Sequence, residues 1–133
     1  MAPLRINRLA RSAGSLSTTG GVTVATRAYV ADSTLARLVG MLGTPDPSDD
    51  EILVLVPCAA VHGVGLRASI GAAFVDRSGR VLRVVDPLPR RGASCWGAHA
   101  VIEAASGVLA VGPGDRLKLG DGSVFPHGGI FPD

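Results

Sequence analysis

The chain has 133 residues and a net charge of only +2, so its charge does not point to a strongly acidic or basic partner. Apolar residues make up 47% of it and aromatic residues only 4%, with 18 glycines and 9 prolines. This length suits one domain with a core of Val, Leu, Ile and Ala, and the frequent helix-breaking residues favour a mainly β fold over a helical bundle.

Several classes of protein are not expected. Arg5, Arg8 and Arg11 recur every third residue, but no aromatic residues are interleaved for base stacking, so nucleic-acid binding is not expected. The longest apolar runs are far shorter than the ~20 residues that cross a bilayer. No apolar segment of a secretion signal follows the basic N-terminus. With only two cysteines, a disulfide scaffold is also not expected. We therefore expect a soluble, cytoplasmic protein without a membrane partner.

The first third of the chain predicts one strand and one helix. Residues 1–21 are expected to be flexible or to form an edge strand, with turn and loop chemistry from residue 12 onward. Residues 22–26 alternate and are rich in β-branched side chains, which predicts a strand. An N-cap within residues 32–34 precedes leucines at helical spacing, so a short helix should follow, with four side chains facing the core: Leu35, Leu38, Val39 and Leu42.

The middle of the chain predicts the sheet interior. Residues 52–56 (ILVLV) are apolar on both faces, which is typical of a central strand. Residues 70–75 and 81–85 predict a hairpin, with Gly79 in the left-handed position of its turn. We expect the 52–56 strand and this hairpin to lie side by side in a dry sheet interior.

The last third predicts two further strands. Residues 99–105 read as a strand with Val101 and Glu103 on one face, although a short helix stays open. A tight turn at residues 112–115 precedes a strand at 116–119, and a last hairpin can reach residues 124–125. The single β-rich domain is expected over residues 22–119, followed by a C-terminal turn and tail over 120–133. We predict a compact β-sandwich or partly open barrel with one or two short helices.

These landmarks resemble, in order, five motifs of domain-of-unknown-function family 192. The motifs are an arginine-x-x-glycine segment closing the helix, a proline-cysteine segment with a histidine, an isoleucine-to-aspartate hairpin, a valine-leucine-glutamate strand and a closing glycine-aspartate-arginine-leucine. The matching stretches are residues 37–43, 57–67, 70–81, 95–107 and 114–117. The resemblance implies a compact, mainly β sandwich or barrel, and it implies no activity or cofactor. Gly71 stands where the family usually has an aspartate, and Gly63 where it has a threonine.

Five residues could carry chemistry: Cys58, His62, Cys95, His99 and Glu103. The two cysteines and two histidines would suit zinc by type. In a strand, however, each Cys–His pair lies ~13 Å apart, too far for one ion. Buried structural thiols, a disulfide between the cysteines and a Cys–His nucleophile remain open as alternatives. No phosphate loop or nucleophile elbow is present.

Two further residues have competing interpretations. Glu103 is expected to face outward or to pair with a cap, and the alternative is an ion pair with Arg37. Trp96 either plugs the core edge or lines a groove for a ligand or a partner chain.

We predict a non-catalytic ligand- or partner-binding module without a cofactor, whose surface includes His62, Arg67, Trp96 and Glu103. The alternative is a small enzyme or zinc protein that uses Cys58, His62 and Cys95.

Overall fold

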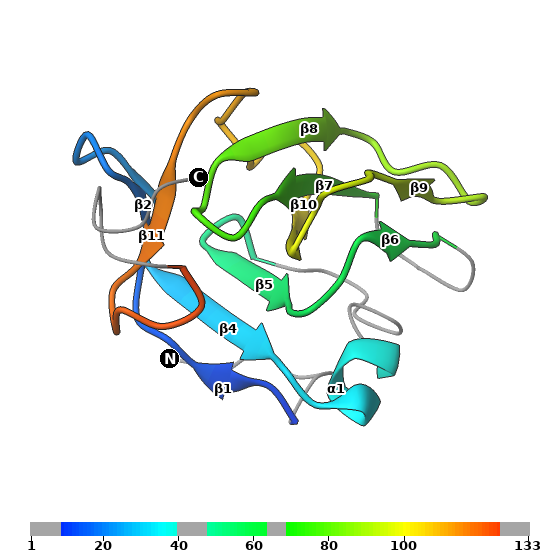
Figure 1. Cartoon of the computed structure of the whole chain (residues 1–133), viewed down its shortest axis with the longest axis horizontal. Helices are drawn as coiled ribbons and strands as arrows, with labels where there is room; N and C mark the ends of the chain where they lie inside the picture. Colours follow the sequence, from blue (N-terminus) through cyan, green and yellow to red (C-terminus); the bar gives the residue numbers. More distant parts are fainter. Residues whose placement is uncertain (1–8, 40–47, 64–68, 126–133) are drawn as a thin grey trace.

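A six-stranded sheet forms the centre of the computed structural model, which describes residues 9–39, 48–63 and 69–125. Its strand order is β1-β4-β5-β10-β7-β8 (Figure 1). Neighbouring strands are antiparallel except β4 and β5, which are parallel. The strands of this central sheet are β1 (Arg11–Ser12), β4 (Arg27–Ala31), β5 (Glu51–Leu55), β7 (Ile70–Val75), β8 (Val81–Val85) and β10 (Ala100–Ala105).

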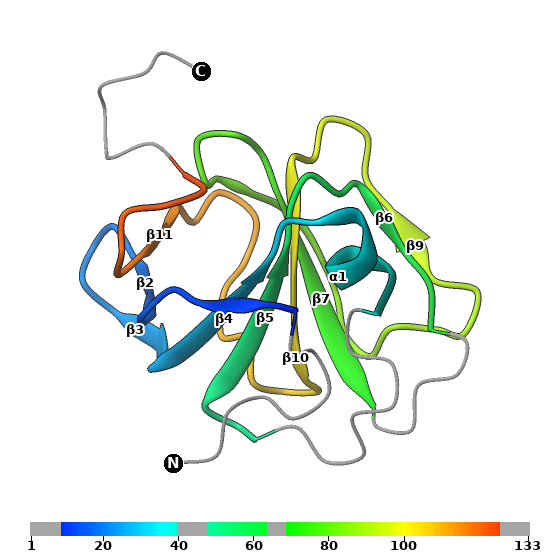
Figure 2. The ribbon, with the colours of Figure 1, turned by 90° about the horizontal axis from the view of Figure 1, so that it is seen from below.

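The central sheet is covered on both sides, as Figure 2 shows. On one side lies a three-stranded sheet of β11 (Leu117–Leu119), β2 (Leu16–Thr18) and β3 (Thr23–Ala25). On the other side lie the helix α1 (Thr34–Val39) and a two-stranded ribbon of β6 (Ala60–Val61) and β9 (Ala93–Ser94). The prediction of a mainly β, sandwich-like fold is confirmed, and the sheets are open and do not close into a barrel.

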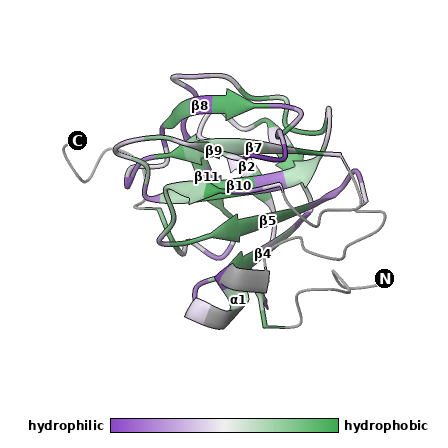
Figure 3. Ribbon diagram, turned by 90° about the vertical axis from the view of Figure 1, so that its right-hand side faces the viewer, coloured by the Kyte–Doolittle hydropathy of each residue, from purple (hydrophilic) through white to green (hydrophobic). Residues whose placement is uncertain are grey.

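The core is apolar on both faces of the central sheet. Every residue of β5 and of β7 is buried, and Figure 3 shows the apolar colouring along β4, β5 and β8. One face packs on the three-stranded sheet through residues such as Ile102 and Leu16. The other face supports α1 and the ribbon through two smaller clusters, around Leu53 and Phe74. Strands buried on both faces lack polar alternation, which is why the sequence pattern located them.

The expected pairing of β5 with the hairpin is wrong in one respect. The β7–β8 hairpin forms as predicted, with Gly79 at a φ of 87°, but β10 lies between β5 and β7. The strand predicted over residues 99–105 is present as β10, but its place in the strand order could not be predicted from the sequence. Register pairs β10 with β5 on one side and β7 on the other, so β5 and β10 are the two middle strands of the sheet.

The N-terminal third contains strands that the sequence did not predict. β3 confirms the strand predicted at residues 22–26, but the predicted loop at residues 12–21 contains β2, and β4 was not predicted at all. The edge strand is β1, after Leu9, and residues 1–8 lie outside the described ranges. Short strands of two or three residues carry too little periodicity to be recognised, because their pairing depends on distant partners.

The predicted helix is present and begins where its cap was expected. Ser33 Oγ accepts a hydrogen bond from the Ala36 amide at 3.1 Å, as an N-cap residue does. The side chains of Leu35, Leu38, Val39 and Leu42, expected to face the core, lie outside what the structure describes. No helix within the described ranges has the length and apolar character needed to cross a bilayer.

Tight turns organise the C-terminal third. The predicted turn at residues 112–115 forms, with Asp115 Oδ2 accepting a hydrogen bond from the Gly112 amide at 2.9 Å. β11 confirms the late strand. The last hairpin does not form as a strand, and Phe125 instead packs into the core, 3% exposed.

Candidate functional site

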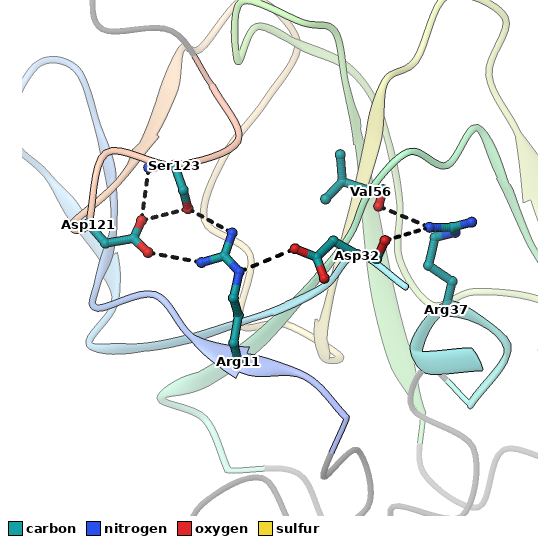
Figure 4. Close-up of polar contacts among 6 residues, drawn as sticks. All are labelled: Arg11, Asp32, Arg37, Val56, Asp121 and Ser123. Atoms are coloured by element: carbon teal, nitrogen blue, oxygen red, sulfur yellow. Dashed lines mark hydrogen bonds and ion pairs between the residues drawn. The ribbon is translucent and has the colours of Figure 1, made fainter. Parts of the chain in front are cut away.

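A chain of polar contacts runs through Arg37 on α1 to the end of β5 (Figure 4). Arg37 Nη1 donates hydrogen bonds to the carbonyl oxygens of Asp32, at 2.9 Å, and Val56, at 3.3 Å. The Asp32 carboxylate pairs with Arg11, whose guanidinium also pairs with Asp121 at 3.0 Å. Hydrogen bonds from a charged donor hold their geometry well. The contacts therefore join α1, β1 and the carboxyl end of β5.

Glu103 is the buried acid of the central strand. It is 4% exposed on β10, paired with Leu53 of β5 and Ala72 of β7. Burial alone raises the pKa of this carboxyl to about 7, and no hydrogen bond or neighbouring charge within the described ranges offsets the burial. The expectation of an outward-facing or cap-paired carboxylate is wrong, because a central strand is covered on both faces.

The alternative ion pair between Glu103 and Arg37 is not formed either. The ion pairs among the described residues do not include it, and Arg37 uses Nη1 on two backbone carbonyls. Among the described residues, the buried carboxyl on this middle strand therefore has no counter-charge.

Cys58 follows β5 and lies near both charged groups. Its amide donates to the carbonyl of His99 at 2.9 Å, and its thiol donates to the carbonyl of Ala60 at 3.2 Å. Burial raises the pKa of the thiol; the charge of Glu103 adds to this effect, and that of Arg37 opposes it. Cys58 also packs against both clusters on this face of the sheet. The thiol is therefore partly buried above β10, and its neutral form is favoured.

The β6–β9 ribbon carries the other candidates. Its register pairs Ala60 with Ser94, and the Cys95 amide donates to the carbonyl of Ala59 at 2.9 Å. Trp96 follows at one end of the ribbon and is 98% exposed, so it does not plug the core edge. His62 is exposed at the opposite end.

The predicted recognition surface is therefore not one compact patch. Glu103 lies in the sheet, while His62 and Trp96 lie at opposite ends of the ribbon that covers it. Arg67 lies outside the described residues.

The predicted metal or thiol set is dispersed. Within residues 9–39, 48–63 and 69–125, no three His, Cys, Asp or Glu residues are grouped as metal ligands would be. Cys58 and His62 flank β6, so they are held apart along extended chain, and Cys58 and Cys95 are free thiols. His99 precedes β10, and burial lowers its pKa, with a smaller contribution from Arg77.

The raised pKa of Cys58 predicts a thiol that reacts slowly with alkylating reagents. At pH 7 we expect iodoacetamide to alkylate Cys58 several-fold more slowly than free cysteine, because the thiolate is the reactive form. Alkylation rates are followed by peptide mass spectrometry, with Cys58→Ser identifying the signal. A rate above that of free cysteine would contradict the prediction and favour a catalytic thiol.

Gly92 fixes the ribbon to its neighbouring loop. Its φ is 82°, and a Cβ atom would lie 2.0 Å from the carbonyl oxygen of Val61. Gly97 has a similar φ of 89° with nothing within 4 Å, so it is a matched control. Both alanine variants should lose about 1–2 kcal/mol from the left-handed backbone. Gly92→Ala should lose about 1–3 kcal/mol more from the collision. Urea denaturation measures the free energy of unfolding of both variants. Equal losses would show that the backbone relieves the collision between the new Cβ atom and the Val61 carbonyl without cost.

Asp86 is a residue to which the sequence assigned no role beyond a crossing loop. A Cβ atom at Gly71, where the family resemblance expects aspartate, would lie 2.7 Å from the Asp86 carboxyl. Asp86 accepts hydrogen bonds from the Gly107 amide, at 2.8 Å, and from the Ser106 hydroxyl. A carboxylate thus occupies this side of β7, but it comes from a position 15 residues further along the chain.

The sequence model of DUF192, described as "Uncharacterized ACR", matches residues 15–119. The chain belongs to this family. A search of the curated proteins found no significant match.

Two solved structures are similar to this DUF192 chain. A "putative transcription regulator" from Sinorhizobium meliloti 1021 has a TM-score of 0.68 and 18% identity, over 83% of this chain and 92% of that chain. A protein of unknown function from Novosphingobium aromaticivorans DSM 12444 has a TM-score of 0.65 and 19% identity, over 78% of this chain and 81% of that chain. At these identities the likeness shows a shared fold.

Proposed function

We propose that this DUF192 domain is a non-catalytic binding module that recognises a partner protein through Trp96. The observation that carries the proposal is the 98% exposure of the only tryptophan in the chain. An indole buries a large apolar area when a partner covers it, and tryptophan is enriched among residues that dominate binding energy. A fully exposed tryptophan is therefore a natural anchor for a partner.

The turn that presents Trp96 is held by backbone hydrogen bonds on both sides. The Ala98 amide donates to the Cys95 carbonyl at 3.2 Å, and the His99 amide donates to the Val75 carbonyl at 2.7 Å. The Cys95 amide is bonded to the ribbon through Ala59. An anchor held in place before binding loses little conformational entropy when the partner arrives.

The surroundings of Trp96 suggest the chemistry of the partner. Ala59 and Ala60 are exposed on the segment paired with β9. Arg83 Nη1 donates to the Ser94 carbonyl at 2.7 Å, next to the turn. Arg77 is close enough to His99 to affect its pKa. An apolar anchor flanked by arginines fits a protein segment that places acidic side chains beside an apolar one.

The alternative of a small Cys/His enzyme has less support. A nucleophilic cysteine needs a lowered pKa or a contacting base, whereas burial raises the pKa of Cys58. His62 is separated from Cys58 by β6. We assign the binding role to the cytoplasm, because both cysteines are free thiols, the form that a reducing compartment maintains.

A comparison of matched baits tests the proposal. Wild type, Trp96→Ala and Val22→Ala are immobilised and exposed to the same cell extract; Val22 is an apolar residue 63% exposed elsewhere. We expect a partner that the wild type and Val22→Ala retain and Trp96→Ala loses. The purified partner should then shift the emission of Trp96 to shorter wavelength, since no other tryptophan contributes from this chain.

Two results would overturn the proposal. One is retention of the same proteins by all three baits. The other is an emission shift produced by anionic phospholipid vesicles and not by any retained protein, because Trp96 would then be a membrane anchor.

A further inference from the structure

We propose that Arg83 is a positioning residue for Trp96: its guanidinium reaches from β8 to the ribbon and fixes the turn that presents the indole. Arg83 acts through this turn, and its role rests on the proposed function of Trp96. The contact that carries the proposal is the hydrogen bond from Arg83 Nη1 to the Ser94 carbonyl, at 2.7 Å. Ser94 is the last residue of β9, two positions before Trp96.

The peptide group between Ser94 and Cys95 is held at both of its polar atoms. Its carbonyl oxygen accepts the bond from Arg83, and its N–H donates to the Ala59 carbonyl at 2.9 Å. Because a peptide group is planar and rigid, bonds to both atoms fix the direction in which the chain leaves it. The next residue in that direction is Trp96.

Trp96 occupies the first central position of the turn that follows. The Ala98 amide donates to the Cys95 carbonyl at 3.2 Å and closes the turn. Gly97 has a φ of 89°, which is typical of the second central position of a type II turn. The backbone therefore sets the shape of the turn, and the peptide group before it sets the direction in which the turn points.

Arg83 supplies the side-chain part of this support. The bonds from the Cys95, Ala98 and His99 amides join backbone atoms, so side-chain substitutions leave them in place. β8 is the last strand in the order of the central sheet, and β9 belongs to the ribbon that covers this sheet, so the Arg83 bond joins two layers (Figure 1). A charged donor makes a stronger hydrogen bond than a neutral one. The identity of residue 83 therefore decides how firmly the start of the turn is held.

A firmly held turn lowers the entropic cost of binding. A partner that docks on Trp96 has to immobilise the turn wherever the free chain leaves it mobile, and that ordering reduces the affinity. Arg83 provides part of this order before the partner arrives. Loss of its N–H donors should therefore weaken binding although every atom of the indole is still present.

The test compares Arg83→Met with Arg91→Met in the full chain. Methionine keeps an unbranched stem without N–H donors, and Arg91 is an exposed arginine before β9 whose replacement removes the same charge. In Arg83→Met we expect the Cys95 amide to exchange about three- to tenfold faster, as for the loss of one exposed hydrogen bond. The Gly63 amide, bonded to the Arg90 carbonyl at the opposite end of the ribbon, should exchange at the wild-type rate.

The backbone of Trp96 supplies the second measurement. In Arg83→Met, the order parameter of its amide from ¹⁵N relaxation should fall from the rigid range, about 0.85, toward the flexible range, below about 0.6. Arg83→Lys keeps a cationic donor and should recover part of the order. Arg91→Met should leave the order parameter unchanged.

Both measurements use the free chain, so they judge the role of Arg83 separately from the proposed function. The purified partner should bind Arg83→Met about two- to tenfold more weakly than wild type, because it must then order the turn. An unchanged exchange rate at Cys95 or an unchanged order parameter at Trp96 overturns the proposal. Equal changes in Arg83→Met and Arg91→Met also overturn it, because the effect would then come from the lost charge. Neither result alters what the Trp96→Ala bait retains.

Discussion

Replacing Phe74 by alanine is expected to lower the free energy of unfolding by about 3–5 kcal/mol, the range for removing a fully buried aromatic side chain. Phe74 is 0% exposed near the carboxyl end of β7 and is the largest fully buried side chain in the described part of the chain. Its cluster includes Val101, its cross-strand neighbour on β10, and packs against Cys95 and Val61 of the covering ribbon. The cavity would therefore lie directly beneath the proposed binding elements.

The local effect of Phe74→Ala on the β6–β9 ribbon can be separated from the loss of overall stability. Phe125 is also buried, 3% exposed, but it belongs to the cluster on the opposite face. Both alanine variants should lower the urea midpoint. Only Phe74→Ala should speed hydrogen exchange at the Cys95 and Gly63 amides, which are bonded across the ribbon and its loop. Equal acceleration in both variants would show that the ribbon does not depend on Phe74 in particular.

Stability is expected to fall as the pH rises from about 4.5 to 7, with a contribution of about 3 kcal/mol from Glu103. Its pKa is about 7 in the folded protein and ordinary, near 4.5, in the unfolded chain. Below pH 4.5 both states are protonated and this group costs nothing. Between the two values the folded state holds a proton that the unfolded state has lost, so rising pH favours unfolding. Above pH 7 the loss is complete.

Glu103→Gln isolates this contribution. The amide is close in shape to the protonated acid, so the variant should match wild type at pH 4.5 and exceed it by about 3 kcal/mol at pH 8. His99 titrates in part of the same window with the opposite sign, because its pKa is lowered, but it is present in both proteins and cancels in the difference. Urea denaturation at a series of pH values measures the difference in unfolding free energy between the variant and wild type. A difference that stays constant with pH would show that folding does not raise the pKa of Glu103.

The strands recognised from the sequence are those whose apolar run is long and continuous. Residues 52–56 and 70–75 could be assigned because both faces are buried and no polar residue interrupts them. β4 and β2 were missed: β2 is only three residues long, and β4 begins with Arg27, only one residue after the end of β3. Short strands depend on partners far along the chain, as β2 does on β11, and local periodicity does not contain that information.

The candidate site was only partly accessible from the sequence. The residue types of Glu103, Cys58 and Trp96 drew attention to them, and the faces of β10 were assigned correctly from alternation. Their environments were not. Glu103 was expected to face outward or to pair with a cap, because acidic residues are usually exposed, and for Trp96 both the core edge and a binding groove remained open. Burial of Glu103 and full exposure of Trp96 both run against the ordinary preference of the residue type, and the exposure of Trp96 supports the proposed function.

The sequence by itself determined the fold class, the buried strands β5, β7 and β10, the capped helix, the turn at residues 112–115 and the family, because each depends on local periodicity, turn chemistry or motif order. Only the tertiary structure decided that β10 inserts between β5 and β7, which buries Glu103 without a counter-charge from the described residues and places Cys58 near it. Strand order depends on contacts between segments about 50 residues apart, as β5 and β10 are, or about 100 apart, as β2 and β11 are. Such contacts are governed by packing of the whole chain and leave no local signature.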